Sequence, residues 1–148
     1  MEDVNLIIKR IAQISYDNLP VEKGWERYEI DVYTLSKYTE LEATYYLNDG
    51  EAVSFNPEYE NSVGIEDDLT FVFLKLREQM YKLSPAEGAW FSCKFIFFSS
   101  GDYKTIFNYD DEPDFEYKPS KEQYIEELKK YPRETTMPNW LKQVTNQK

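Results

Sequence analysis

Hydrophobic residues recur at helical spacing near the N-terminus and again in the middle of the chain. In the first segment the repeating positions are Val4, Ile7, Ile8, Ile11 and either Ile14 or Ser15. This spacing predicts a helix, which Pro20 terminates. In the second segment, over 65–81, the repeating positions are Ile65, Leu69, Val72, Phe73, Leu76 and Met80. This spacing predicts a second helix, with Glu66, Asp67 and Asp68 in its first turn, where the helix dipole favours negative charge.

Polar and apolar residues alternate in five segments outside these helices. The segments are GWERYEIDVYTLS, LEATYYL, EAVSFN, GAWFSCKFIFFSS and YKTIFNY. Alternation with a period of two predicts half-buried strands. Asn48-Asp49-Gly50 supplies a tight hairpin turn between the second and third strands, and Ser100-Gly101-Asp102 turns the chain between the last two. Ile96 and Phe98 lie opposite the inward-facing positions, which indicates that the second face of the sheet is also covered, by a helix or by a partner.

A C-terminal helical segment is predicted over 120–142. Ser120 and Gln123 have the spacing of a capping box, and Pro132 ends the helix that they begin. A short turn pinned to the body by Trp140 completes the segment, and the tail from Val144 onward is expected to fray. The order α-β-β-β-α-β-β-α predicts an α+β fold with a single antiparallel sheet of about five strands and packed helices. The length of the chain, 148 residues, suits one domain over 1–148.

The charge balance limits the classes of partner. The chain carries 28 Asp and Glu residues against 17 Lys and Arg residues, a formal net charge of −11. A field of this sign repels phosphate backbones and anionic membranes and attracts basic surfaces, so we expect no direct binding to nucleic acid or membranes. No apolar run approaches membrane-spanning length, and the N-terminus lacks the pattern of a signal peptide. We therefore expect a cytoplasmic protein that is monomeric when free.

The sequence contains no histidine and a single cysteine, Cys93. Without histidine the chain has no Ser-His or Cys-His dyad and lacks the usual zinc ligand. Cys93 lies in an alternating aromatic segment, so we expect a buried, unreactive thiol. We accordingly expect no catalytic residues, no metal site and no cofactor.

The segment YDDEPDFE opens an acidic loop near 109–118, directly after the last predicted strand. Its carboxylates are Asp110, Asp111, Glu112, Asp114 and Glu116, interleaved with the aromatic residues Tyr109, Phe115 and Tyr117. A calcium loop would need a glycine where Pro113 stands, and a magnesium site would need further carboxylates from elsewhere. Two interpretations remain: a docking surface for a basic protein, with aromatic anchors, or a solvated loop whose aromatic side chains fold onto the core. Glu58, Tyr59 and Glu60 form a second candidate docking patch.

Several segments resemble one known family. They are Gly88-Ala89-Trp90-Phe91-Ser92, Phe107-Asn108-Tyr109-Asp110-Asp111, Tyr131-Pro132-Arg133 and Met137-Pro138-Asn139-Trp140-Leu141, together with the helix that carries Leu69, Phe73 and Leu76. In these segments the chain is similar to the YezG-type immunity proteins of bacterial polymorphic toxin systems. The resemblance implies a small cytosolic antidote, encoded beside a secreted toxin, that binds and silences the cognate toxin domain, often a nuclease. It implies no catalytic residues.

Charge and resemblance together lead to one expected function. We expect a non-enzymatic immunity protein that neutralises a basic toxin domain, such as a nuclease, by protein–protein association. The docking residues would be those of the acidic loop, with the 58–60 patch as a second contact. Two alternatives stay open: a metal-dependent hydrolase that uses clustered carboxylates, and an adaptor or regulatory module whose partner is not a toxin.

Overall fold

The computed structural model describes residues 3–60, 64–135 and 137–146. The helices in this part of the chain are α1 (Val4–Asp17), α2 (Leu69–Leu83), α3 (Lys121–Lys130) and α4 (Asn139–Asn146), with short 3-10 turns at Ile65–Asp67 and Pro85–Glu87. The strands are β1 (Trp25–Leu35), β2 (Tyr38–Leu47), β3 (Ala52–Phe55), β4 (Ser92–Phe98) and β5 (Tyr103–Asn108). This order confirms the predicted α+β class, with α3 and α4 together forming the final helical section.

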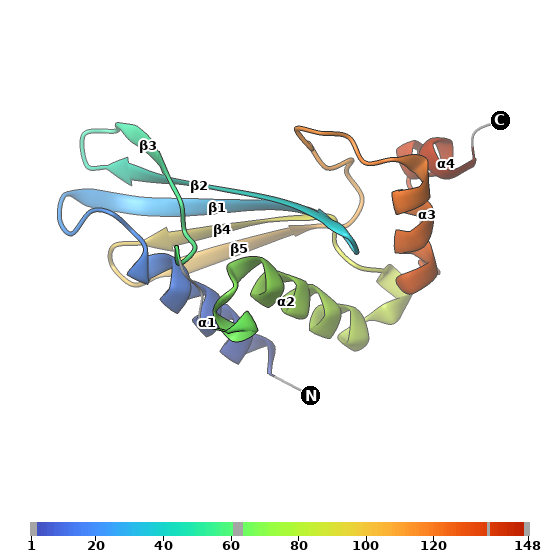
Figure 1. Cartoon of the computed structure of the whole chain (residues 1–148), viewed down its shortest axis with the longest axis horizontal. Helices are drawn as coiled ribbons and strands as arrows, with labels where there is room; N and C mark the ends of the chain where they lie inside the picture. Colours follow the sequence, from blue (N-terminus) through green and yellow to red (C-terminus); the bar gives the residue numbers. More distant parts are fainter. Residues whose placement is uncertain (1–2, 61–63, 136, 147–148) are drawn as a thin grey trace.

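The strands form one antiparallel sheet in the order β3-β2-β1-β4-β5 (Figure 1). β1, β2 and β3 form a meander, and β4 and β5 form a hairpin that pairs with the free side of β1. In the register, Ile30 lies between Ala43 and Phe95, and its neighbour Asp31 lies between Glu42 and Lys94. Because successive residues of a strand point to opposite faces, Ile30 and its partners lie on one face of the sheet and Asp31 and its charged partners lie on the other.

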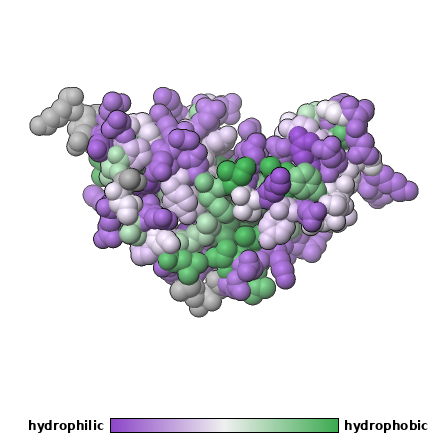
Figure 2. All heavy atoms as spheres, turned by 180° about the vertical axis from the view of Figure 1, so that it is seen from behind, coloured by the Kyte–Doolittle hydropathy of each residue, from purple (hydrophilic) through white to green (hydrophobic). Residues whose placement is uncertain are grey.

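The face of the molecule seen in Figure 2 is largely hydrophilic. Figure 2 shows mostly purple, hydrophilic atoms, with a green apolar band near the middle of the view. The large hydrophobic side chains that are exposed are Leu6, Tyr16, Ile65, Leu83, Tyr103, Ile106 and Tyr117. All nine Phe and three Trp residues are buried or half-buried. The aromatic content of the chain is therefore used mainly for packing.

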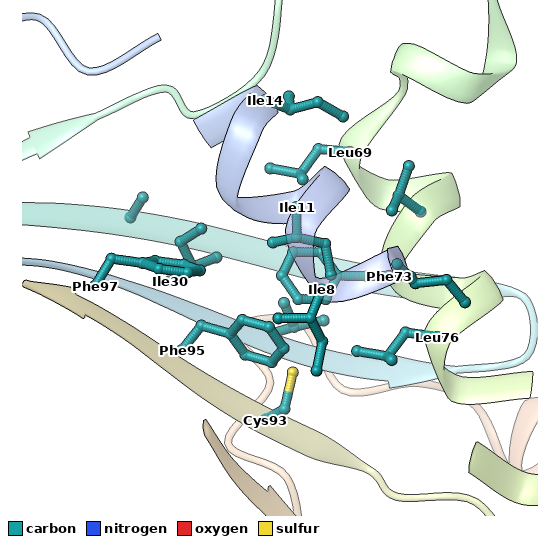
Figure 3. Packing of buried hydrophobic residues seen from close by; sticks show 14 of the residues in the cluster. Ile8, Ile11, Ile14, Ile30, Leu69, Phe73, Leu76, Cys93, Phe95 and Phe97 are labelled. Carbon is teal, nitrogen blue, oxygen red and sulfur yellow. The ribbon is translucent and has the colours of Figure 1, made fainter. Parts of the chain in front are cut away.

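The main core lies between the sheet and the pair α1–α2 (Figure 1). Figure 3 shows Ile8 and Ile11 of α1 and Phe73 of α2 meeting Phe95 of β4. Every one of these side chains is less than a tenth exposed. Cys93 lies in the same cluster, and burial raises the pKa of its thiol well above the ordinary value. The expected burial of this cysteine is confirmed, and its low reactivity stays a prediction. We call this side of the sheet the inner face.

A second apolar cluster lies at one end of the sheet, beneath α3 and α4. Its buried members are Leu35, Phe91, Phe115, Tyr124 and Leu141. Trp140 packs edge-on against Phe91 and Tyr124, with ring centroids 5.4 Å and 5.9 Å apart. This contact attaches α4 to the body of the protein, as predicted. The capping box at Ser120 and Gln123 is also present at the start of α3.

A buried ion pair connects α2 to α3. The guanidinium of Arg77 donates to both carboxylate oxygens of Glu127, at 3.0 Å and 2.6 Å, and its Nε donates to the carbonyl of Trp90 at 2.6 Å. Both charged side chains are 1% exposed. The planar group also lies over the ring of Tyr131, 5.2 Å from its centre. No pattern in the sequence predicts this pair.

The middle helix begins later than predicted. Asp68 is the N-cap of α2, because its backbone is extended and its carboxylate accepts from the amide of Phe71 at 3.1 Å. Ile65 therefore lies outside the helix and is 62% exposed, so its assignment to the apolar stripe is wrong. Glu66 and Asp67 also precede the helix, and Asp67 instead pairs with Arg10 of α1.

The C-terminal segment contains more helix than predicted. The prediction of a short turn followed by a fraying tail is wrong as far as Asn146. The helix α4 spans Asn139–Asn146 and extends beyond the predicted end of the segment at 142. Trp140, Leu141 and Val144 recur at helical spacing and all contact the second cluster. Residues 147–148 of the predicted tail lie outside the described residues.

The face of the sheet opposite α1 and α2, which we call the outer face, is covered at one end. There Phe115 packs against Tyr33, with ring centroids 6.2 Å apart. Ile96 and Phe98 are half-buried and belong to neither apolar cluster. In the described part of the chain, no helix packs over them (Figure 1). The expected helical cover for these residues is therefore not found there.

Candidate functional site

The acidic loop, residues 109–118, starts where β5 ends and is shaped from its first residues. The side-chain oxygen of Asn108 accepts from the amides of Asp110 and Asp111, at 3.2 Å and 2.9 Å. The side-chain amide of the same Asn108 donates to the carboxylate of Asp111 at 2.9 Å. Such local side-chain bonds stabilise a turn that a free acidic segment would not hold.

Asp110 attaches the loop to the C-terminal section. Its carboxylate accepts from Nη2 of Arg133 at 2.8 Å, and its carbonyl accepts from the indole of Trp140 at 2.7 Å. The Arg133 side chain is 2% exposed, whereas Asp110 is 67% exposed. Gly88 makes room for this arginine, since a Cβ there would lie 2.6 Å from its Cγ. Asp110 therefore has a structural contact in addition to its exposed position.

The three aromatic residues of the loop have different environments. Phe115 is 8% exposed in the second cluster, so it is part of the core and unavailable as an exposed anchor in this structure. Tyr109 is half-buried against the main core. Tyr117 is 70% exposed. Of the predicted anchors, Tyr117 is the one whose ring is open to a partner.

Glu40 of β2 holds the far end of the loop. Its two carboxylate oxygens accept from the amides of Glu116 and Tyr117, at 2.6 Å and 3.0 Å, and it also accepts from the hydroxyl of Tyr38. Burial raises the pKa of Glu40, but these hydrogen bonds outweigh it, so the net pKa lies below the ordinary value. The hydrogen bond that the Tyr38 hydroxyl donates to Glu40 raises the pKa of Tyr38 to about 12. Glu40 thus acts as an ionised clamp.

The replacement Glu40→Ala is expected to free the end of the loop. Each lost hydrogen bond should cost about 0.5–1.5 kcal/mol of local stability, so exchange of the amides of Glu116 and Tyr117 should quicken about two- to tenfold. Amide hydrogen exchange by NMR measures this. Glu42→Ala is the control, two residues along the same strand. Equal exchange rates in both variants would show that Glu40 is not the clamp.

The clamp should also depend on pH. Because the folded pKa of Glu40 is lowered, its stabilising contribution is complete above the ordinary pKa of 4.5 and is lost as pH falls through the lower folded value. Exchange at Tyr117, corrected for intrinsic rates, should therefore gain protection across that window as pH rises. A flat profile would contradict the assignment.

Residues of β1 and β2 and of the acidic loop line an acidic pocket of about 350 Å³. Its lining includes the carboxylates of Glu40, Glu42, Asp114 and Glu116, with Tyr33 at its side. Burial, and then the charges of Asp31 and Glu42, raise the pKa of Tyr33. An aromatic ring among carboxylates is a suitable environment for a Lys or Arg side chain. Glu40 and Glu42 are not among the residues predicted from the sequence, although their alternate positions on β2 place both on the polar face.

The second predicted patch lies elsewhere. Tyr59 donates to the carboxylate of Asp17 at the end of α1, at 2.6 Å, and Glu58 accepts from Thr70 of α2 at 3.4 Å. These contacts hold the patch to the helices, while the acidic loop is held to β2. Glu60 is exposed. The structure therefore does not bring Glu58, Tyr59 and Glu60 together with the acidic loop.

Two further properties concern the residues that the structure describes. Among them, no group of three or more Cys, Asp or Glu side chains is arranged to hold a metal ion. None of their helices has the length and apolar character needed to cross a bilayer.

Comparison with known proteins adds no family assignment. No family model matches the chain, and no curated protein matches it either.

Proposed function

We propose that this chain is an immunity protein that binds a basic toxin domain, such as a nuclease, and neutralises it without catalysing a reaction. One observation carries the proposal: the acidic loop is held at both ends, by Asn108 and Asp110 at its start and by Glu40 at its end. Its carboxylates Glu112, Asp114 and Glu116 remain exposed. A charged surface held in one conformation loses less entropy on binding than a flexible one.

The charge of the whole chain supports the same proposal. With a net charge of −11, the protein attracts cationic surfaces over several ångströms and repels the nucleic acid that such a toxin would bind. A nuclease groove is cationic because it holds a phosphate backbone. In the proposed complex the acidic loop occupies or flanks that groove. The encounter takes place in the cytoplasm, where a toxin that has entered would act.

Co-expression with the product of the neighbouring gene tests this function. The expected result is that host cells survive when this chain is present and die when it is absent. Equal killing in both cultures would contradict the proposal. Calorimetric titration with Mg²⁺, Mn²⁺ and Ca²⁺ tests the hydrolase alternative, because a saturable micromolar site would favour it.

A further inference from the structure

The half of the outer face on β4 and β5, which we call the apolar half, also carries Lys94 and Lys104, and the Lys104 ammonium lies 5.9 Å from the ring centre of Phe98. Ile96 and Phe98 are half-buried on this face, and Ile106 of β5 is 54% exposed. The register pairs Ile96 with Lys104 and Lys94 with Ile106, so the two isoleucines are diagonal neighbours. In the described part of the chain no helix covers these three large apolar side chains, and apolar patches on a protein surface mark interaction sites.

The other half of this face, on β1 and β2, carries more carboxylates than cations, and its Arg27 pairs with Glu29 at 2.8 Å and with Glu26 at 2.6 Å. Asp31 lies between Glu42 and Lys94 in the register, and Glu29 lies between Thr44 and Ile96. Lys94 pairs with Glu29 at 3.2 Å and with Asp31 at 3.6 Å, so its charge is already matched within the face. Glu42 is exposed and also lines the acidic pocket. Carboxylates thus continue from this half of the sheet into the loop.

We propose that the outer face is the main docking surface, and that its occupant is a segment of the partner with apolar side chains beside Lys or Arg residues. The inference rests on the proposed function, which makes the partner basic, and it adds where and how that partner binds. The apolar side chains of the segment cover Ile96, Phe98 and Ile106. Its cations meet Glu42 and the acidic pocket. This arrangement is that of an interface with an apolar centre and a charged rim.

Two single replacements test the face with the toxin domain encoded by the neighbouring gene. Ile106→Lys puts a like charge in the apolar half, and Glu42→Lys reverses one rim charge; each should weaken binding at least about tenfold. Leu83→Lys, at the end of α2, and Glu22→Lys, before β1, are matched controls at exposed positions. They should stay within about twofold of the parent, because scattered surface contacts contribute little. Calorimetry gives each affinity.

The outcomes separate this inference from the proposed function. If the parent chain binds and the two face variants bind equally well, the docking surface is wrong while the function stands. If the parent chain does not bind, the proposed function is wrong for that toxin. A second probe then tests the docking surface. This probe is a synthetic ten-residue peptide of alternating Leu and Lys, titrated into the labelled full chain.

Amide shifts in the NMR spectrum report where this peptide binds. If the outer face is the docking surface, the largest shifts lie on β1, β2, β4 and β5. These shifts should be smaller in the Ile106→Lys variant and unchanged in the Leu83→Lys variant. Shifts confined to α1 and α2, or to the acidic loop alone, would overturn it. Circular dichroism of each variant verifies that the fold is intact, which the exposure of Ile106 and Glu42 favours.

Discussion

The variant Glu127→Gln is expected to lower the free energy of unfolding by about 3–5 kcal/mol, because it leaves the Arg77 guanidinium buried without a charged partner. The pair is bidentate, and both side chains are 1% exposed, so water cannot replace the lost carboxylate. Urea denaturation followed by circular dichroism measures the change. In a chain of this size, the melting temperature should fall by roughly 10 °C.

Glu126→Gln is the matched control for this change. Glu126 is the preceding residue of α3, half-exposed, and pairs with Lys37 at 3.1 Å. An exposed pair of this kind contributes about 0–1 kcal/mol, so the control should unfold near the parent. If both variants unfold at the same urea concentration, the buried pair does not connect α2 to α3 as described. The double replacement Arg77→Met/Glu127→Leu should recover much of the loss, because it removes both charges.

Reversing the three outward carboxylates of the acidic loop is expected to weaken toxin binding on the order of 100-fold, mainly through slower association. The variant is Glu112→Lys/Asp114→Lys/Glu116→Lys. Asp110 is left in place because its contact with Arg133 supports the loop. Surface plasmon resonance at several salt concentrations measures the rates. Association of the parent chain should slow steeply as salt rises, since at 0.1 M salt the screening length is only about 10 Å.

A charge-matched control isolates the position of these carboxylates. Glu22→Lys/Glu51→Lys/Glu66→Lys changes three exposed carboxylates outside the loop. Each replacement adds two positive units, so both triple variants move from −11 to −5. If the control slows association as much as the loop variant, net charge alone accounts for the attraction. In that case the loop only keeps the protein soluble.

The resemblance in sequence concerns residues that the structure uses for packing. Gly88 gives space to Arg133, which contacts Asp110, whose carbonyl accepts from Trp140. Phe91 lies beneath Trp140. The four short segments that carry the likeness therefore meet in one region and hold the C-terminal section in place. The residues that would select a partner, such as Ile106 and Glu42, lie outside those segments.

Local rules explain which elements were predictable and which were not. The alternation in β1 and the stripe in α1 follow from fixed backbone periods, so they hold wherever one side of an element is buried. Ile65 fits the stripe of α2 equally well, yet Asp68 caps the helix after it. The helix α4 is too short for its sequence alone to predict it. Its apolar residues Trp140, Leu141 and Val144 are explained by their contacts in the second cluster.

The amino-acid sequence by itself determined the fold class, the strand pattern, the negative field and the acidic character of the loop. All of these depend on composition or on neighbours a few residues apart. The tertiary structure alone decided that Phe115 is buried, that Glu40 holds the amide of Glu116 across 76 residues, and that Glu127 meets Arg77 across 50. The packing of the whole chain brings such partners together, because no local sequence pattern predicts which distant polar group a carboxylate will contact.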